Sequence, residues 1–226
     1  MTITLTPYLI TTPMTGKVVN GKNIALTVEG DEACILCPDF VYMHPDGGLR
    51  LVAPTHGAAT ESVHRTRTEW MEAFYWPVES AAHHWLRQTM TVERVNQAGR
   101  IVIGQMHVKN SNNPFIKIFW DKGAIKIGYR EKETMSPVTT TICRGVELGQ
   151  RVSLSLHVTK VGSVSLTVKA GGVSYNFSRK MDPSWFGFMF NFHGGLYNQL
   201  DYSDLIPLED GSEATIHSLI VSHDLE

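Results

Sequence analysis

A chain of 226 residues is long enough for one sizeable hydrophobic core, and all-β sandwiches of this length are commonly one domain. Hydrophobic residues make up 42% of the sequence, which excludes global disorder, and charged residues make up 19%, with a formal net charge of −2. This balance provides no basic stripe for nucleic acid, so we expect no nucleic-acid partner. It still permits a local basic cleft that binds an anionic ligand.

The N-terminal segment MTITLTPYLITTPMTGK lacks the basic and apolar regions of a secretory signal peptide. The localisation stays open: this absence favours the cytoplasm unless the chain is exported by another route or is a trimmed form. No apolar run approaches the roughly 18 residues of a membrane-spanning helix, so we expect no membrane partner. We expect a single domain over 1–226 and a monomer.

Cysteine and histidine spacing argues against a metal centre. Cys34 and Cys37 have C-x-x-C spacing, but no second cysteine pair or histidine cluster accompanies them, and Cys143 leaves the count odd. We expect buried free thiols. The adjacent His83 and His84 would point to opposite sides of a strand, so we expect no metal and no cofactor.

Turn signals with glycine recur along the chain, and short β-branched or aromatic segments lie between them. Many segments alternate with a period of two, which predicts half-buried antiparallel strands. In chain order the clearest predicted strands are 23–30, 99–108, 114–120, 151–160, 163–170 and 214–223. Residues 151–179 are predicted as a three-stranded meander, and 79–88 has room for one helical turn. The predicted fold class is all-β, a sandwich of two sheets.

Three segments carry clustered polar side chains on one face, because alternate residues of a strand point to the same side. The shared-face sets are Arg65, Arg67, Glu69 and Met71 in 64–74; Ile103, Gln105, His107 and Lys109 in 103–109; and Asn191, His193, Gly195, Tyr197 and Gln199 in 190–199. Solvated sheet faces usually carry Lys, Glu, Thr and Ser, whereas guanidinium, imidazole, phenol and amide groups suit oriented hydrogen bonding. The pattern indicates either a solvated face or a binding site.

These segments resemble the three signatures of alginate lyases of polysaccharide lyase family 7, which are R-[ST]-E-[LV]-R, Q-[IV]-H and Y-F-K-A-G-x-Y-x-Q. They read RTEWM (67–71), QMH (105–107) and NFHGGLYNQ (191–199), in the family's order. The lead-in 47–69 and the closing segment 214–225 are also similar to the family, so the resemblance covers most of the chain. It implies a β-jelly roll of two antiparallel sheets with a concave substrate cleft, and β-elimination of an anionic polysaccharide.

The resemblance also implies roles for individual residues. The implied catalytic residues are Arg67, Gln105, His107 and Tyr197, and the candidate substrate-binding residues are Arg65, Glu69, Lys117, His193 and Gln199. Lys117 and Lys126 also fit the plain alternative of solvated strand lysines. The chain departs from the family patterns at Met71, Met106, His193 and Gly194, which leaves open whether the polymer is alginate or another polyuronate such as glucuronan.

The residue chemistry is compatible with elimination. The site must neutralise the uronate carboxylate, for which Arg67 supplies a fixed cation and Gln105 an amide donor. His107 and Tyr197 are the candidate acid and base. A tyrosine with a pKa of about 10 is a poor base unless cations lower that pKa, which Arg67, and His193 if charged, could do. In mannuronate, where proton and leaving oxygen share a side, Tyr197 would serve both roles. In guluronate, His107 would take the proton.

Two other functions fit parts of the pattern. A glycoside hydrolase needs two carboxylates on one face, but Glu69 and Glu72 fall on opposite faces of their strand. A non-catalytic carbohydrate-binding module needs aromatic platforms but no base or acid. The five tryptophans could supply platforms, although we expect most of them in the core. We expect the glycines of 191–199 to keep this strand slim beneath a polymer, with a β-bulge as the alternative.

Overall fold

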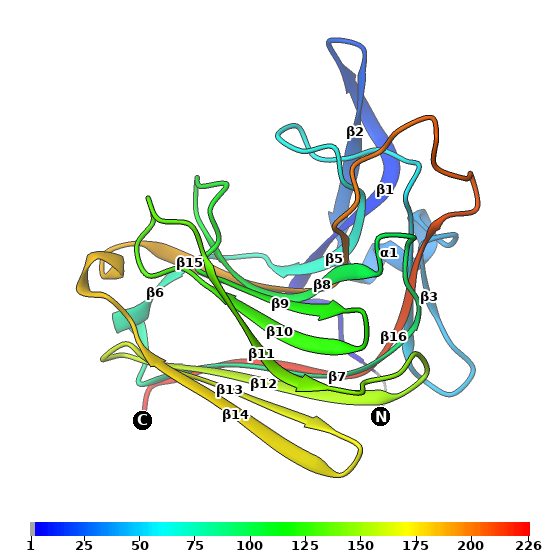
Figure 1. The fold of residues 1–226 in the computed structure, drawn as a ribbon. Helices are drawn as coiled ribbons and strands as arrows, with labels where there is room; N and C mark the ends of the chain where they lie inside the picture. The colour runs from blue at the N-terminus through cyan, green and yellow to red at the C-terminus, as the bar shows by residue number, and fades with distance from the viewer. Residues whose placement is uncertain (1–2) are drawn as a thin grey trace.

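The computed structural model describes residues 3–226, and strands dominate its secondary structure. Two antiparallel sheets pack face to face as a jelly-roll sandwich (Figure 1), which confirms the all-β prediction. Their inward faces form the core, because alternate residues of each strand are apolar. In β12, Val152, Leu154, Leu156 and Val158 are buried, and the residues between them are half-buried.

The nine-stranded sheet has the order β11-β10-β9-β8-β15-β5-β1-β2, with β6 paired to β15. Its strands are β1 (Tyr8–Val19), β2 (Lys22–Glu29), β5 (Arg67–Glu72), β6 (Trp76–Pro77), β8 (Arg100–Val108), β9 (Ile116–Asp121), β10 (Ala124–Tyr129), β11 (Val138–Arg144) and β15 (Met189–Asn198). Its upper face in Figure 1 is flanked on one side by the β1–β2 hairpin and on the other by the loops that follow β8 and β10.

The seven-stranded sheet has the order β14-β13-β12-β7-β16-β4-β3. Its strands are β3 (Val41–Met43), β4 (Leu49–Pro54), β7 (His83–Arg94), β12 (Arg151–Thr159), β13 (Ser163–Ala170), β14 (Val173–Lys180) and β16 (Gly211–Asp224). The predicted meander corresponds to β12, β13 and β14, which pair in sequence order. Within residues 3–226, helical structure is limited to α1 (Gly30–Leu36) and the short 3-10 turns η1 (Val78–Ser80) and η2 (Pro183–Trp185).

The range 79–88, which had room for one helical turn, contains the end of η1, and β7 begins within it at His83. One local prediction was wrong. The pairing of β8 with β9 shifts between Val102 and Gly104, which turns the intervening Ile103 into the core, where it is 1% exposed. Ile103 therefore does not share a face with Gln105 and His107.

The structure also bears on the cysteines and on a possible membrane span. Cys34, Cys37 and Cys143 are free thiols, of which Cys37 and Cys143 are buried. Within residues 3–226, no helix has both the length and the apolar character needed to cross a membrane.

Candidate active site

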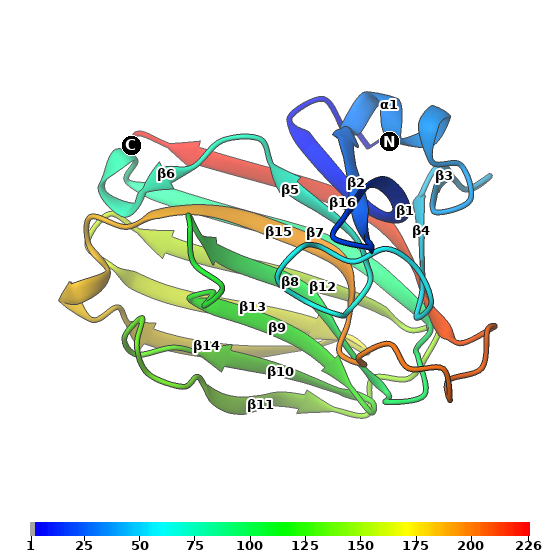
Figure 2. The same cartoon turned by 90° about the horizontal axis from the view of Figure 1, so that it is seen from above.

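Adjacent strands of the nine-stranded sheet carry the predicted site residues, and β5, β15, β8 and β9 lie side by side in Figure 2. Strand register places Tyr197 of β15 opposite Arg67 of β5, and His193 opposite Gln105 of β8. On the other side of β8, Gln105 pairs with Lys117 of β9. Residues far apart in the sequence therefore meet on one sheet face.

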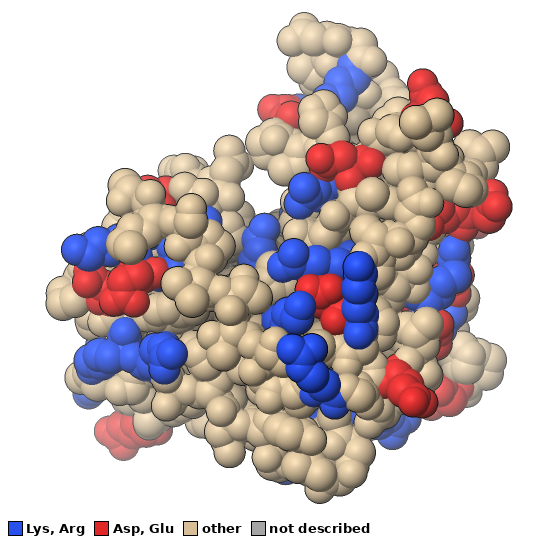
Figure 3. Space-filling view, in the orientation of Figure 1, with Lys and Arg blue, Asp and Glu red and all other residues tan. Residues whose placement is uncertain are grey.

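A cavity of about 270 Å³ lies over this face. The loop residues Thr60 and Val63 line one wall, and Asn112 and Pro114 of the loop after β8 line another. The sequence-predicted residues that line it are Arg67, Glu69, Gln105, His107, Lys117, His193 and Tyr197. Figure 3 shows Lys and Arg side chains around a small acidic patch in the middle of this side of the molecule. The basic residues that line the cavity itself are Arg67 and Lys117.

Other predicted residues lie outside the cavity. Arg65 donates from Nε to Oδ1 of Asp201 at 2.7 Å and from Nη1 to Oε1 of Gln199 at 3.3 Å. Arg65 and Gln199 thus bind each other beyond the cavity lining. Lys109 is exposed, with Nζ 5.6 Å from the ring centroid of Tyr75.

Glu69 is the charged centre of the cavity and is only 1% exposed. Its Oε1 accepts from Nε2 of Gln105 at 2.5 Å, and its Oε2 accepts from Nη1 of Arg67 at 3.0 Å. Nδ1 of His193 lies 3.6 Å from the same Oε2. Burial alone would raise the pKa of Glu69, but Arg67, His193 and Gln105 outweigh it and lower the pKa to about 2. Glu69 is therefore an anion that orients the two groups expected to receive a substrate carboxylate.

The imidazole of His107 is half-buried and neutral. Burial and then the neighbouring His193 lower the pKa of His107 to about 3. The two imidazole rings stack with centroids 4.8 Å apart and planes inclined by 16°. His107 makes no side-chain hydrogen bond to any residue in 3–226, and its Nδ1 is buried without a partner. Its lone pair is available to accept a proton from a ligand in the cavity.

Tyr197 faces the cavity beneath two cations. The guanidinium carbon of Arg67 lies 3.8 Å from the ring centroid, and Nζ of Lys117 lies 5.4 Å from it. Burial raises the pKa of Tyr197 and outweighs the lowering effect of Arg67, so the cations do not turn this phenol into a stronger base in the free protein. Burial also lowers the pKa of Lys117 to about 8. In the free protein Tyr197 is a protonated phenol, suited to donate a proton.

The glycines of β15 serve packing, and the expectation that they make room for a polymer was wrong. A Cβ on Gly194 would lie 2.7 Å from Cζ2 of Trp70, a core side chain. Gly195 has a φ of +114°, and a Cβ there would lie 2.8 Å from the carbonyl oxygen of Thr68. The pairing of β15 with β8 shifts at this point, so the alternative of a β-bulge is correct.

The loop wall of the cavity was missed by sequence reasoning. Lys22 at the start of β2 donates from Nζ to the backbone carbonyls of Thr60, Glu61 and Val63, at 3.0, 2.9 and 2.7 Å. This lysine fixes a segment that has no strand periodicity. The only sequence signal is a lysine beside the Asn20-Gly21 turn, which does not identify the loop that it binds.

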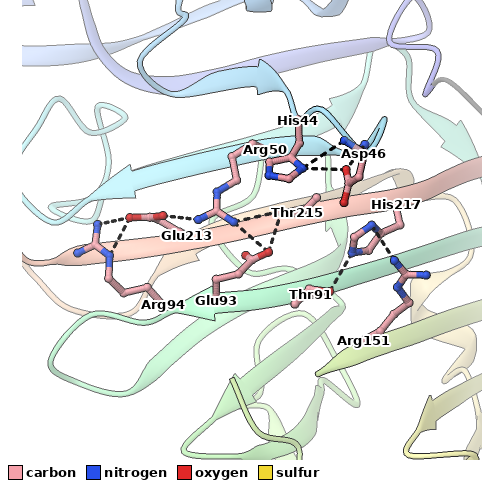
Figure 4. Close-up of polar contacts among 11 residues, drawn as sticks. His44, Asp46, Arg50, Thr91, Glu93, Arg94, Arg151, Glu213, Thr215 and His217 are labelled. Atoms are coloured by element: carbon pink, nitrogen blue, oxygen red, sulfur yellow. Dashed lines mark hydrogen bonds and ion pairs between the residues drawn. The ribbon is translucent and has the colours of Figure 1, made fainter. Parts of the chain in front are cut away.

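A second charged cluster lies on the seven-stranded sheet (Figure 4). Arg50 pairs with Glu93 at 2.9 Å and also with Glu213, and Arg94 donates to Glu213 at 2.9 Å. Burial raises the pKa of Glu93. The carboxylates of Glu93 and Glu213 thus meet from different strands, a pair that the sequence did not reveal. Both carboxylates form ion pairs with arginine, as in a structural ion-pair network.

The tryptophans give little support to a binding module. Trp70, Trp76, Trp120 and Trp185 are buried. Trp85 is half-buried on the seven-stranded sheet; the ring of His157 stacks on it at 3.7 Å, and Arg87 lies 4.0 Å from its ring centroid. None of the five lines the cavity over β5, β15 and β8.

Fold and cavity together define a jelly-roll β-sandwich whose nine-stranded sheet carries a cavity lined by arginine, lysine, imidazole and phenol side chains. The chain belongs to the alginate lyase family, because the family model described as "Alginate lyase" matches residues 3–223. A comparison with curated protein sequences finds no significant match.

Solved alginate lyases share this fold. Alginate lyase PA1167 from Pseudomonas aeruginosa is 26% identical with a TM-score of 0.85, over 98% of this chain and 100% of that one. The alginate lyase from Klebsiella pneumoniae is 20% identical with a TM-score of 0.83, over 97% and 96%. Alginate lyase A1-II', a member of polysaccharide lyase family 7, is 19% identical with a TM-score of 0.81, over 99% and 97%. The predicted family is confirmed.

Proposed function

We propose that this chain cleaves 4-linked uronate polymers of the alginate type by β-elimination. The observation that carries the proposal is the cavity in which neutral His107 and protonated Tyr197 lie beside Arg67 and Gln105. Family membership supports it, and the related lyase A1-II' has been solved with a substrate, GGMG, and a product, GGG.

The first task of the site is to neutralise the uronate carboxylate. The proton on C5 is weakly acidic while the carboxylate carries its full charge, so removing it requires hydrogen-bond donors that stabilise the enolate-like intermediate. Arg67 has donors beyond the one used by Glu69, and the amide of Gln105 has a second N–H. Because Glu69 already orients both groups, they are preorganised for a carboxylate.

The second task is to move two protons. A base takes the C5 proton, the electron pair forms the C4–C5 double bond, and the C4–O4 bond breaks. The departing oxygen receives a proton from Tyr197, and no water is consumed. For guluronate, His107 takes the C5 proton from the side opposite the leaving oxygen. For mannuronate, Tyr197 serves both steps and must first lose its own proton, which its raised pKa makes costly.

The test is incubation of the purified chain with polymannuronate, polyguluronate and glucuronan. We expect the ultraviolet absorbance of an unsaturated uronate end to appear with at least one polymer, and mass spectrometry to find products that contain no added water. His107→Ala should reduce cleavage of polyguluronate more than that of polymannuronate. Products with only saturated ends would support a hydrolase, and binding without any product would support a carbohydrate-binding module.

A further inference from the structure

The hydrogen bonds around His193 determine which of its ring nitrogens carries a proton. Nδ2 of Asn191 donates to the backbone carbonyl of Glu72 at 3.1 Å. A carbonyl oxygen can only accept, so this contact fixes the orientation of the Asn191 amide. Oδ1 of Asn191 therefore faces His193, with Nε2 of the ring 2.9 Å away. Because Oδ1 also can only accept, Nε2 of His193 carries a proton.

The other nitrogen of His193 faces an anion. Nδ1 lies 3.6 Å from Oε2 of Glu69, and it is buried without a hydrogen-bond partner in residues 3–226. In a neutral ring with its proton on Nε2, Nδ1 would direct a lone pair at this carboxylate. In the doubly protonated ring, Nδ1 directs an N–H at it. Only a protonated Nδ1 would present a donor to this carboxylate.

We infer that His193 is a positioning residue whose positive charge holds Glu69 and keeps the stacked His107 unprotonated, an inference that rests on the proposed function. The two rings are 4.8 Å apart, close enough for one charge to oppose a second. The other charged groups that face the pair are Arg67 and Glu69 of β5 and Lys117 of β9. Glu69 alone would draw a proton onto His107, and the cation at position 193 counters this effect.

The charge at position 193 should therefore set the acid limit of activity. In His193→Gln the amide is neutral, so His107 takes up a proton at higher pH, and the acid limb of kcat/KM moves upward by on the order of one pH unit. In His193→Lys a cation is retained, and the acid limb stays near its wild-type position. If His193 had only a structural role, both variants would change the rate, but the acid limb of kcat/KM would not move in His193→Gln alone.

Nuclear magnetic resonance of the protein without substrate tests the same inference independently of turnover. Long-range proton–nitrogen spectra at neutral pH should show His193 protonated on both nitrogens and His107 neutral, with assignments from the His193→Gln and His107→Ala spectra. His217→Gln is the matched control, because His217 lies on the seven-stranded sheet between Thr91 and Arg151 (Figure 4). It should leave the acid limb and the His107 signal unchanged.

A neutral His193 at neutral pH would overturn the inference, and so would an acid limb that moves equally in the Gln and Lys variants. The two failures are separable. If the wild-type chain yields no unsaturated product, the proposed function fails, while the spectra still establish whether His193 carries the charge.

Discussion

The cavity over β5, β15 and β8 and the cluster on the seven-stranded sheet each hold a carboxylate against arginine, but they use their groups differently. In the cluster, His217 is bonded at both nitrogens, at 2.8 Å to Thr91 and 3.2 Å to Arg151. In the cavity, neither His107 nor the Tyr197 hydroxyl has a side-chain hydrogen-bond partner in residues 3–226. Groups already paired within the protein stabilise it, whereas unpaired groups remain available to a ligand.

Burial separates the two regions further. Side-chain exposure is 2% for Glu69 of the cavity, against 26% for Glu213 and 28% for Glu93 of the cluster. Water reaches and partly screens these half-buried pairs, so each contributes less to stability than a buried pair would. The buried carboxylate of Glu69 is not solvated by water, so its charge is stabilised by Arg67, Gln105 and His193 instead. Burying these charged groups costs free energy, and a cost of this kind indicates that the arrangement serves function rather than stability.

The largest expected effect is the loss of turnover in Tyr197→Phe. The change removes one hydroxyl and keeps the ring that packs under Arg67. We expect kcat to fall by about 10²–10⁴-fold, the usual cost of losing a general acid or base, with little change in KM or thermal stability. Steady-state kinetics and thermal unfolding measure these quantities.

The control is Tyr202→Phe, because Tyr202 is exposed and its hydroxyl bonds only Asp204. It should keep the wild-type rate. A Tyr197→Phe variant that retains more than about a tenth of the wild-type rate would remove Tyr197 from the mechanism.

The same substitution can be made in the two regions, as Glu69→Gln in the cavity and Glu213→Gln in the cluster, and its effect on stability compared. Glu69→Gln leaves the half-buried Arg67 and the buried His193 without an anion, and we expect it to lower the free energy of unfolding by about 3–5 kcal/mol. Glu213→Gln leaves Arg50 paired with Glu93, and we expect a loss of about 1 kcal/mol. Urea unfolding of both variants measures the difference, and equal losses would contradict the assigned role of burial.

Buried and half-buried histidines should also differ in how they make folding stability depend on pH. His84 is fully buried, its Nε2 donates to the carbonyl of Val78 at 2.8 Å, and burial lowers its pKa to about 4. An unfolded histidine has a pKa near 6.5, so the unfolded chain binds more protons between these values. Stability should fall by on the order of 2 kcal/mol as the pH drops from about 6.5 to about 4.

Urea midpoints across this pH range measure the effect. In His84→Gln the dependence should shrink, whereas His217→Gln should retain most of it. An unchanged pH dependence in His84→Gln would assign the acid sensitivity to other groups.

Strand periodicity was enough to predict the sandwich and most of the cavity face. Arg67, Gln105, His107, His193 and Tyr197 each lie on a strand whose alternation identifies the face that they share. Periodicity fails where a strand has a bulge, so it misplaced Ile103 and gave the wrong purpose for the two glycines of β15. It also gives no direction for pKa shifts, because desolvation depends on the complete cavity.

Contacts between distant segments could not be predicted from the sequence, because they too depend on the complete three-dimensional structure. Lys22 and the 60–63 loop, or Glu93 and Glu213, are brought together only by sheet order and loop closure. No local pattern records that order, so neither the loop wall nor the second carboxylate pair was predictable.

The smallest expected effect concerns Arg65, at the edge of the basic face. Arg65 is paired with Asp201 and Gln199 outside the cavity, and its side chain is 35% exposed. Its contribution to binding an anionic polymer is therefore largely screened, since the Debye length at 0.15 M salt is about 8 Å. Arg65→Ala should raise KM by about two- to fivefold at low salt and leave kcat near the wild-type value. The difference should vanish as the ionic strength rises. Arg151→Ala removes an equal charge from the seven-stranded sheet and should leave KM unchanged at every salt concentration. If both variants raise KM equally, the polymer responds to net charge alone, and the distinction between the two regions fails for binding.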